Sequence, residues 1–385
     1  TFTYDGLGRM MTADKTVNST TVSQDEFAYN GLGAISDANE KLFSGTKRET
    51  DYTYDQAGYL TSTTYPYNSA VINIIPDSQG RIDTLKLGTT EMVTYKYIGS
   101  RVADRKYTYP ATDIVYQPSY DNLGRLTSAN SGTGYAKFDY TYKPGTFDIN
   151  DIVYDHRPAD PIVSFQYDNL SRLTEADYGM TGTNEIFSID DLGNRSNVKM
   201  HDGSNVAYSV NNINNRYNTV DGNALAYDAA GNLTKDKDGY AYHYDYENRI
   251  VKIRKSNDTV DVASYAYDAL GRRIQKVDSI ATTATLYYYG SGWQVLAEYN
   301  GAGAFQRWYA YGNYIDEPLI MNTSANASDA KFYIQDHLYS SAALLDSSGN
   351  VVERYEYDAY GRPYIMDSSY NSRSVNSYGN PYMFT

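Results

Sequence analysis

Hydrophobic and polar residues alternate along most of this chain. Aromatic side chains recur at every second position, as in the Tyr-Thr-Tyr run at 140–142 and the Tyr-Ala-Tyr run at 265–267. In an extended strand this period of two places both rings on one face of a sheet. Uninterrupted apolar runs reach at most four residues, 342–345 being one, whereas a membrane-spanning helix needs ~20. The pattern predicts short β-strands throughout and no membrane span.

A short motif recurs between the predicted strands. It reads Tyr-Asp-x-x-Gly-Arg or Tyr-Asp-x-x-Gly-Asn, usually followed by an aliphatic residue. The residue before each Asp or Asn falls at 4, 29, 54, 76, 120, 167, 189, 211, 227, 244, 267 and 357, so the copies are spaced by about 22 residues or multiples of that number. The clearest copies contain Tyr4, Asp5, Gly8 and Arg9; Tyr120, Asp121, Gly124 and Arg125; Tyr227, Asp228 and Gly231; Tyr267, Asp268, Gly271 and Arg272; and Tyr357, Asp358, Gly361 and Arg362.

Each copy of the motif is interpreted as a hairpin turn. Asp at a strand end accepts hydrogen bonds from turn amides, and Gly three residues later adopts positive φ, as we expect for Gly124 and Gly271. Two strands of ~5–6 residues and two turns use about 22 residues, so one hairpin fills one repeat. The motif Arg is expected to stack on Tyr rings of neighbouring strands and to pair across strands with Asp. The sequence predicts an all-β fold of repeated antiparallel β-hairpins, with helix below ~10%.

Composition narrows the classes of partner. The chain has 44 Tyr against 10 Phe and 2 Trp. Because Tyr has an apolar ring and a polar hydroxyl, this excess suits β-sheets whose faces are exposed or half-buried. Its net charge of −14 repels phosphate backbones and anionic lipids, so nucleic acid and membrane surfaces are poor partners. The absence of Cys excludes disulfides, thiolate metal sites and Cys nucleophiles. The first residues carry no initiator Met and no signal peptide, and we expect a segment of a longer protein.

No catalytic, cofactor-binding or metal-binding residue is predicted. The four His residues, at 156, 201, 243 and 337, lack metal-ligand spacing, and the Asp-Lys-Asp-Gly run at 236–239 lacks the remaining ligands of a calcium loop. Most acidic residues occupy the recurrent turn position, so we expect the segment not to be an enzyme. Rows of Tyr beside Asp and Asn also suit a carbohydrate-binding surface, and this alternative stays open.

The repeats run through the whole chain without a clear linker. We expect one continuous domain, with a β-sheet array of Tyr-Asp repeats over 1–286 and a less regular C-terminal part over 287–385.

With these motifs the chain resembles the Rhs/YD-repeat family. The most specific stretches are Asp-His-Leu at 336–338, the run at 345–362 and the Asn-Pro-Tyr-Met-Phe-Thr element at 380–385, which lead into the family's Rhs-associated core. The family usually has Gly after Asp-His-Leu, where this chain has Tyr339. The resemblance implies hairpins that coil into a spiralling sheet or shell, which would be open in this segment.

The resemblance also implies a function. It indicates a structural β-shell segment of a large bacterial protein, secreted or at the cell surface, that encapsulates or presents a C-terminal effector (toxin) domain. The partners would be the C-terminal core and effector, both absent from this segment, and the open sheet edges would allow self-association. The family's self-cleavage carboxylates are absent too, so no catalytic residue transfers. The alternative is a cell-surface adhesion or carbohydrate-binding module.

Overall fold

The computed structural model describes residues 1–67, 70–109, 114–159, 161–179, 184–211, 213–255 and 257–384. Over these residues the chain forms 36 strands and a single 3-10 turn, η1 (Ala327–Asp329), with no α-helix. None of the described segments is a helix long and apolar enough to cross a membrane. The predicted all-β fold of antiparallel hairpins is confirmed.

The strands follow one another in chain order. The first 25 are β1 (Phe2–Tyr4), β2 (Met10–Val17), β3 (Thr20–Tyr29), β4 (Ile35–Leu42), β5 (Arg48–Tyr54), β6 (Leu60–Thr64), β7 (Val71–Pro76), β8 (Ile82–Leu87), β9 (Thr90–Ile98), β10 (Arg101–Tyr107), β11 (Ile114–Tyr120), β12 (Leu126–Asn130), β13 (Lys137–Tyr142), β14 (Ile149–Tyr154), β15 (Ile162–Tyr167), β16 (Leu173–Asp177), β17 (Glu185–Ile189), β18 (Arg195–Lys199), β19 (Asn205–Asn211), β20 (Arg216–Val220), β21 (Asn223–Ala224), β22 (Ala226–Tyr227), β23 (Leu233–Lys235), β24 (Ala241–Tyr244) and β25 (Ile250–Lys255). The remaining strands are β26 (Val260–Tyr267), β27 (Arg273–Asp278), β28 (Thr283–Tyr289), β29 (Val295–Asn300), β30 (Phe305–Tyr311), β31 (Pro318–Asn322), β32 (Lys331–Gln335), β33 (Ser341–Leu345), β34 (Val351–Tyr357), β35 (Pro363–Met366) and β36 (Ser372–Arg373).

Strand pairing is antiparallel between consecutive strands, apart from one interruption at Leu225, which divides the array into β1–β21 and β22–β36. Strand β28 runs across residues 286 and 287, so that boundary coincides with no break in pairing. Among the described residues, β1 and β36 each pair on one side only, so the sheet is open.

The motif turns have the backbone geometry of a bulged hairpin. A register shift precedes the motif Tyr, for example between Thr3 and Tyr4 and between Ala266 and Tyr267. The predicted positive φ is confirmed at Gly124 (+78°) and Gly271 (+89°). Tyr339, which replaces the family's usual Gly, also has positive φ, at 67°. The turn type therefore persists where the Gly is lost, at the conformational cost of a left-handed Tyr.

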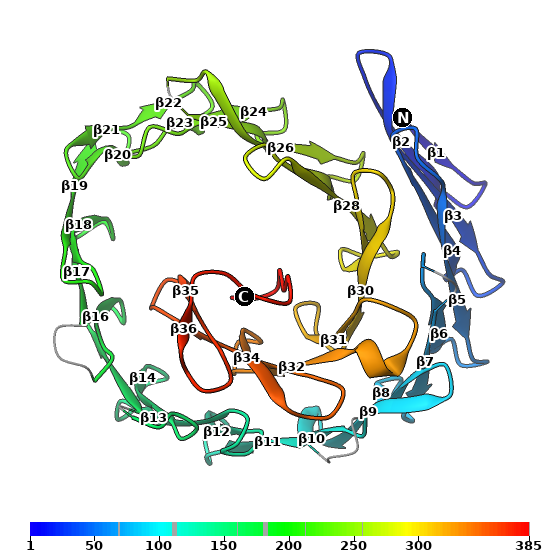
Figure 1. Cartoon of the computed structure of the whole chain (residues 1–385), viewed down its shortest axis with the longest axis horizontal. Helices are drawn as coiled ribbons and strands as arrows, with labels where there is room; N and C mark the ends of the chain where they lie inside the picture. Colours follow the sequence, from blue (N-terminus) through cyan, green and yellow to red (C-terminus); the bar gives the residue numbers. More distant parts are fainter. Residues whose placement is uncertain are drawn as a thin grey trace.

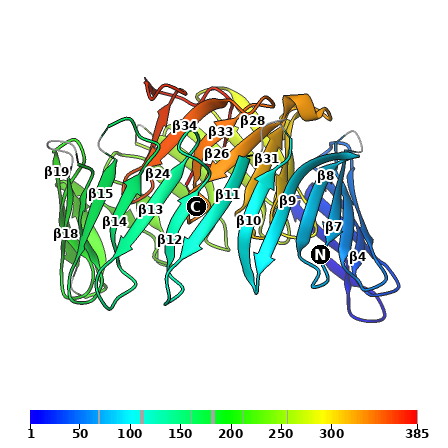
Figure 2. The same ribbon diagram turned by 90° about the horizontal axis from the view of Figure 1, so that it is seen from below.

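The strand array curls into a ring that overlaps itself. Figure 1 shows β1–β25, the first winding, enclosing a hollow, and β26–β36, the second winding, turning inward past the N-terminal strands. Strand β26 lies against β3 and β28 against β4, where the overlap begins. Figure 2 shows that the strands cross the height of the ring, so hairpin turns lie along both of its rims.

A hydrophobic core fills the space where the two windings overlap. Tyr65 of the first winding meets Trp308 of the second edge to face at 5.5 Å, and Tyr107 meets Phe332 at 5.3 Å. Buried Leu, Ile and Met side chains of both windings surround these rings. The overlap therefore has a core between two sheet layers, because one face of the second winding is buried against the first.

A third layer covers the other face of the second winding. The C-terminal segment, residues 376–384, lies at the centre of the ring (Figure 1), and the Ser341 N–H donates to the Met383 carbonyl at 2.8 Å. Tyr333 donates from its hydroxyl to Asn380 Oδ1 at 2.8 Å. Strands β31 and β33 are consequently buried at every position.

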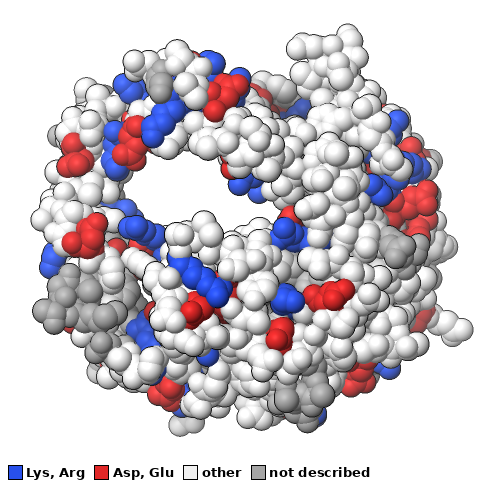
Figure 3. All heavy atoms as spheres, in the orientation of Figure 1, with Lys and Arg blue, Asp and Glu red and all other residues white. Residues whose placement is uncertain are grey.

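Strands β19–β25 of the first winding form a single layer. In β19–β25 the only buried hydrophobic side chain among the described residues is Val220. Figure 3 shows the hollow that this part of the wall borders.

Candidate functional site

Each repeat turn is closed by its Asp. In the first copy the N–H groups of Leu7 and Arg9 donate to Asp5 Oδ1 at 2.8 and 3.0 Å, and Arg9 Nε donates to Asp5 Oδ2 at 2.6 Å. The Arg9 amide is the largest of the interactions that hold the pKa of Asp5 below its usual value, because these bonds favour the charged carboxylate. The motif Asp and Arg thus pair across the two ends of one hairpin, because the turn brings the carboxylate back to the Arg four residues later.

The Arg of one turn joins the Tyr of the next. The Arg9 guanidinium stacks over the Tyr29 ring at 4.4 Å, and the Tyr29 hydroxyl donates to the Met10 carbonyl at 2.7 Å. Arg249 and Tyr267 repeat this stacking at 4.6 Å, and Tyr267 donates to the Ile250 carbonyl at 2.8 Å. The predicted Arg–Tyr stacking is confirmed. It explains why the motif needs both residues, since each copy holds its neighbour.

The other predicted turn residues vary on this plan. At the second clear copy Arg125 Nε donates to Asp121 Oδ2 at 2.7 Å. At the third, an amide replaces the guanidinium, and Asn232 Nδ2 donates to Asp228 Oδ2 at 2.9 Å. At the last, the Arg362 N–H donates to Asp358 Oδ1 at 2.9 Å. The turn residues therefore lie apart along the ring and do not converge on one site.

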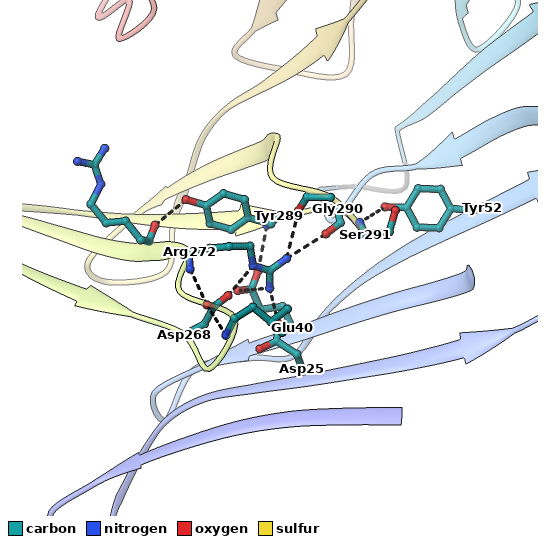
Figure 4. A network of polar contacts seen from close by, with 11 residues as sticks. Asp25, Glu40, Tyr52, Asp268, Arg272, Tyr289, Gly290 and Ser291 are labelled. Carbon is teal, nitrogen blue, oxygen red and sulfur yellow. Dashed lines mark hydrogen bonds and ion pairs between the residues drawn. The ribbon is translucent and has the colours of Figure 1, made fainter. Parts of the chain in front are cut away.

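The copy at Asp268 and Arg272 differs, because it joins the two windings (Figure 4). Arg272 Nε contacts Asp268 Oδ2 at 2.5 Å within the turn, and Arg272 Nη2 contacts Asp25 Oδ1 of the first winding at 2.6 Å. Glu40 Oε1 lies 3.7 Å from the same nitrogen, and Glu40 Oε2 accepts the Tyr289 N–H at 3.0 Å. We call Asp25, Glu40, Asp268 and Arg272 the seam cluster; all four are buried.

The seam cluster has more acidic groups than basic ones. Three carboxylates surround one guanidinium, and burial raises the pKa of Asp25 to about 7 and that of Glu40 well above its usual value. Ligand oxygens of Asp25, Glu40 and Asp268 lie within 4.8 Å of one another, a spacing that a metal ion could bridge. The guanidinium already contacts two of them, so Arg272 offsets part of the charge of the cluster.

Further along the ring, Arg105 makes a second buried connection. Arg105 Nη1 of the first winding contacts Glu317 Oε1 of the second at 2.5 Å and Gln335 Oε1 at 3.0 Å. The Tyr95 hydroxyl donates to the same Glu317 oxygen at 3.1 Å. This network fixes strands β9 and β10 against the turn before β31 and the end of β32.

Other polar contacts continue the same interface. Arg157 donates to both carboxylate oxygens of Glu356 at 2.8 Å. The Tyr140 hydroxyl lies 3.1 Å from His337 Nδ1, which gives this His of the family stretch a contact between the windings. Such buried or half-buried pairs set the register of the two windings, because a shifted register would leave charges unpaired.

These partners were not predicted from the sequence. The motif around Arg272 reads like the others, and its partner Asp25 lies 247 positions away. One signal was present: apolar residues run without alternation at 319–321 and 342–345, as in strands buried on both faces.

Comparisons with known proteins agree with this architecture. Two curated relatives are 30% identical over 191 residues: the tRNA3(Ser)-specific nuclease WapA of Bacillus spizizenii and the tRNA nuclease WapA of Bacillus subtilis. The matched region is 49% of this chain and only 8% of each relative.

Solved structures show the same fold at lower identity. The TcdB2-TccC3 structure matches with a TM-score of 0.72 and 14% identity over 98% of this chain and 24% of that chain. The Tc holotoxin pore of Photorhabdus luminescens matches with a TM-score of 0.69 and 15% identity over 94% of this chain and 22% of that chain. The Teneurin YD-shell family model matches residues 157–375, more than half of the chain. With its repeated Tyr-Asp turns and spiralling sheet, the chain is an Rhs/YD-repeat protein and belongs to the Teneurin YD-shell family.

Proposed function

We propose that this chain is a structural segment of a β-shell, part of a larger secreted or surface protein, and that the shell encloses a C-terminal effector domain. The observation that carries the proposal is the position of residues 376–384 at the centre of the ring (Figure 1). A polypeptide joined to this segment would start inside the ring, and Figure 3 shows that the ring encloses a hollow. The chain's own role is mechanical: its turns, Tyr rings and seam contacts hold a wall in shape.

The relatives indicate the class of effector. Two of them are named as tRNA nucleases, and the solved structures with this fold include a Tc holotoxin. A toxic enzyme is therefore the cargo we propose, with its catalytic residues outside this segment.

Limited proteolysis of the full-length gene product tests enclosure. We expect sequence C-terminal to the shell to resist protease in the wild type and to become cleavable when Arg272→Ala weakens the seam cluster. Arg9→Ala is the matched control, because Arg9 occupies the same motif position and, within the described part of the chain, pairs with Asp5 of its own turn and stacks on Tyr29. Equal cleavage of the effector in all three proteins would show that the shell presents its cargo without enclosing it.

One cavity supports the alternative of a carbohydrate-binding module. A space of about 610 Å³ between the windings is lined by several Tyr side chains, with Arg101 and Asp336 beside them. Aromatic faces and polar groups together suit sugar rings. Calorimetric titration with oligosaccharides tests this function: Tyr120→Ala at the cavity should abolish binding, and Tyr246→Ala, a change at an exposed Tyr elsewhere, should not. Absence of heat with every glycan would refute it.

A further inference from the structure

The largest cavity described above lies where the second winding passes β9–β11 (Figure 1). Its volume of about 610 Å³ falls within the range of about 300–1,000 Å³ that is usual for small-molecule sites. The first winding contributes Arg101 and Arg105, and the second contributes residues just before β31 and at the end of β32. Aromatic rings from both windings form much of the wall: Tyr97, Tyr116, Tyr120, Tyr314 and Tyr339.

One turn at this cavity departs from the repeat plan. The turn between β9 and β10 consists of residues 99–100 and carries no Asp. Arg101 follows it and stacks over the Tyr120 ring at 4.5 Å, as Arg9 stacks over Tyr29 at 4.4 Å. Six Arg residues at this position of the repeat pair with an Asp four residues earlier: Arg9, Arg81, Arg125, Arg172, Arg249 and Arg272. Among the described residues Arg101 forms no ion pair, so its guanidinium is held in the usual place without the usual carboxylate.

Most other polar groups in the cavity wall are already engaged. Glu317 accepts from Arg105 Nη1 at 2.5 Å through one oxygen and from the Asn313 N–H at 2.8 Å through the other. Gln335 Oε1 accepts from the same Arg105 nitrogen at 3.0 Å. Burial raises the pKa of Asp336 to about 7, which reduces its negative charge near neutral pH. Arg105 Nε, in contrast, is buried without a hydrogen-bond partner in the described part of the chain, so the unused groups include cationic donors.

A strained residue supplies one of the aromatic faces. Tyr339 has a φ of 67°, a conformation that a bulky side chain rarely adopts, and its ring stacks on Tyr314 at 4.9 Å with 20° between the planes. Such strained residues are concentrated at ligand sites, because the surrounding structure must compensate for their conformational cost. Gly would fit this backbone more easily but would leave no ring in the cavity wall.

We propose that this cavity binds a small aromatic carboxylate. The carboxylate of the ligand takes the place of the missing Asp beside Arg101, since a planar guanidinium binds a carboxylate through two parallel hydrogen bonds. The aromatic ring of the ligand packs against the Tyr rings, in the offset or edge-to-face geometry that aromatic pairs prefer. The inference does not depend on the proposed shell function, and it assigns the cavity a different ligand from the carbohydrate alternative.

Saturation-transfer NMR titrations of the full chain test the proposal with three probes. Benzoate carries both the ring and the carboxylate, benzamide carries the ring without the charge, and acetate carries the carboxylate without the ring. Benzoate should bind about tenfold or more tightly than either of the others, because only benzoate uses both parts of the site. Raising the salt concentration should weaken benzoate binding and leave benzamide binding unchanged, because salt screens only the charged contact.

Variants separate binding from folding. Arg101→Met should raise the Kd for benzoate about tenfold or more. Arg216→Met is the matched control: Arg216 stacks over Tyr227 at 5.4 Å and likewise forms no ion pair in the described residues, but it does not line the cavity. It should leave the Kd within about twofold. Tyr339→Gly should raise the Kd about threefold or more while the melting temperature stays the same or rises, because the change removes both the ring and the backbone strain.

Three outcomes would overturn the proposal: no binding of benzoate, benzamide binding as tightly as benzoate, or equal effects of Arg101→Met and Arg216→Met. Binding of oligosaccharides without binding of benzoate would assign the cavity to the carbohydrate alternative, and binding of neither would refute both ligand classes. If Arg101→Met does not fold, as judged by circular dichroism, Arg101→Lys should still raise the Kd severalfold, because an ammonium group lacks the planar pair of donors.

Discussion

Replacing Arg272 by Met should open the seam between the windings. The guanidinium is 3% exposed on the side chain and contacts Asp25 and Asp268 at 2.6 and 2.5 Å. Its removal leaves three buried carboxyl groups without their cation, and loss of one partner of a buried ion pair costs about 3–5 kcal/mol. Asp25 and Glu40 can relieve part of that cost by taking up protons, so the loss should be larger at pH 8 than at pH 5.

Chemical denaturation and hydrogen exchange would measure the effect. Because the cluster joins β3 and β4 to the turn between β26 and β27, we expect faster exchange in those strands and unchanged exchange in β14–β16. Arg9→Met is the control: it removes the same motif residue at an exposed turn and should have a much smaller effect on the free energy of unfolding.

A rescue experiment separates charge from packing. Adding Asp25→Asn and Glu40→Gln to Arg272→Met removes two of the stranded carboxyl groups and should restore about half of the lost stability or more, since neutral replacement of a whole buried ionic group is often tolerated. The reasoning is refuted if Arg272→Met changes the free energy of unfolding by less than about 0.5 kcal/mol and leaves exchange in β3 and β27 unaltered.

Three further outcomes follow from the same geometry. Gly271→Val should lower the free energy of unfolding by about 1–3 kcal/mol, because Val tolerates positive φ poorly. An added Cβ meets no atom closer than 3.5 Å there, so the backbone strain and not a clash should cause the loss. Gly6→Ala, at a turn Gly without positive φ, should leave the melting temperature unchanged. Burial raises the pKa of Asp25 to about 7 in the folded state, against 3.8 in the unfolded state, so the folded state binds one more proton and the free energy of unfolding falls as pH rises from about 4 to 7. The difference in the free energy of unfolding between wild type and Asp25→Asn should fall over the same pH range. A difference that does not change with pH would contradict this. Tyr29→Phe removes the hydrogen bond to the Met10 carbonyl and should cost about 0.5–1.5 kcal/mol in a urea titration, and an unchanged midpoint would show that the stacked ring alone holds the next turn.

Local structure was readable from the sequence because it depends on neighbours. The period of two, the Asp that closes each turn and the Gly at positive φ all act within one hairpin. The Arg–Tyr contact from Arg9 to Tyr29 spans one repeat, so a spacing of about 22 residues was enough to predict it. The hairpin array and its turn chemistry follow from these short-range rules.

The overlap of the windings was decided only by the tertiary structure. Which strand meets β3 depends on the twist and curvature accumulated over the whole first winding. No single motif in the sequence determines that total. Arg9 and Arg272 therefore share a motif, yet one lies at an exposed turn and the other is buried against Asp25. The apolar runs in β31 and β33 indicate burial on both faces, but an alternation pattern cannot name the partner. The seam exists because distant strands meet there, and their sequences reveal only that each has a face to bury.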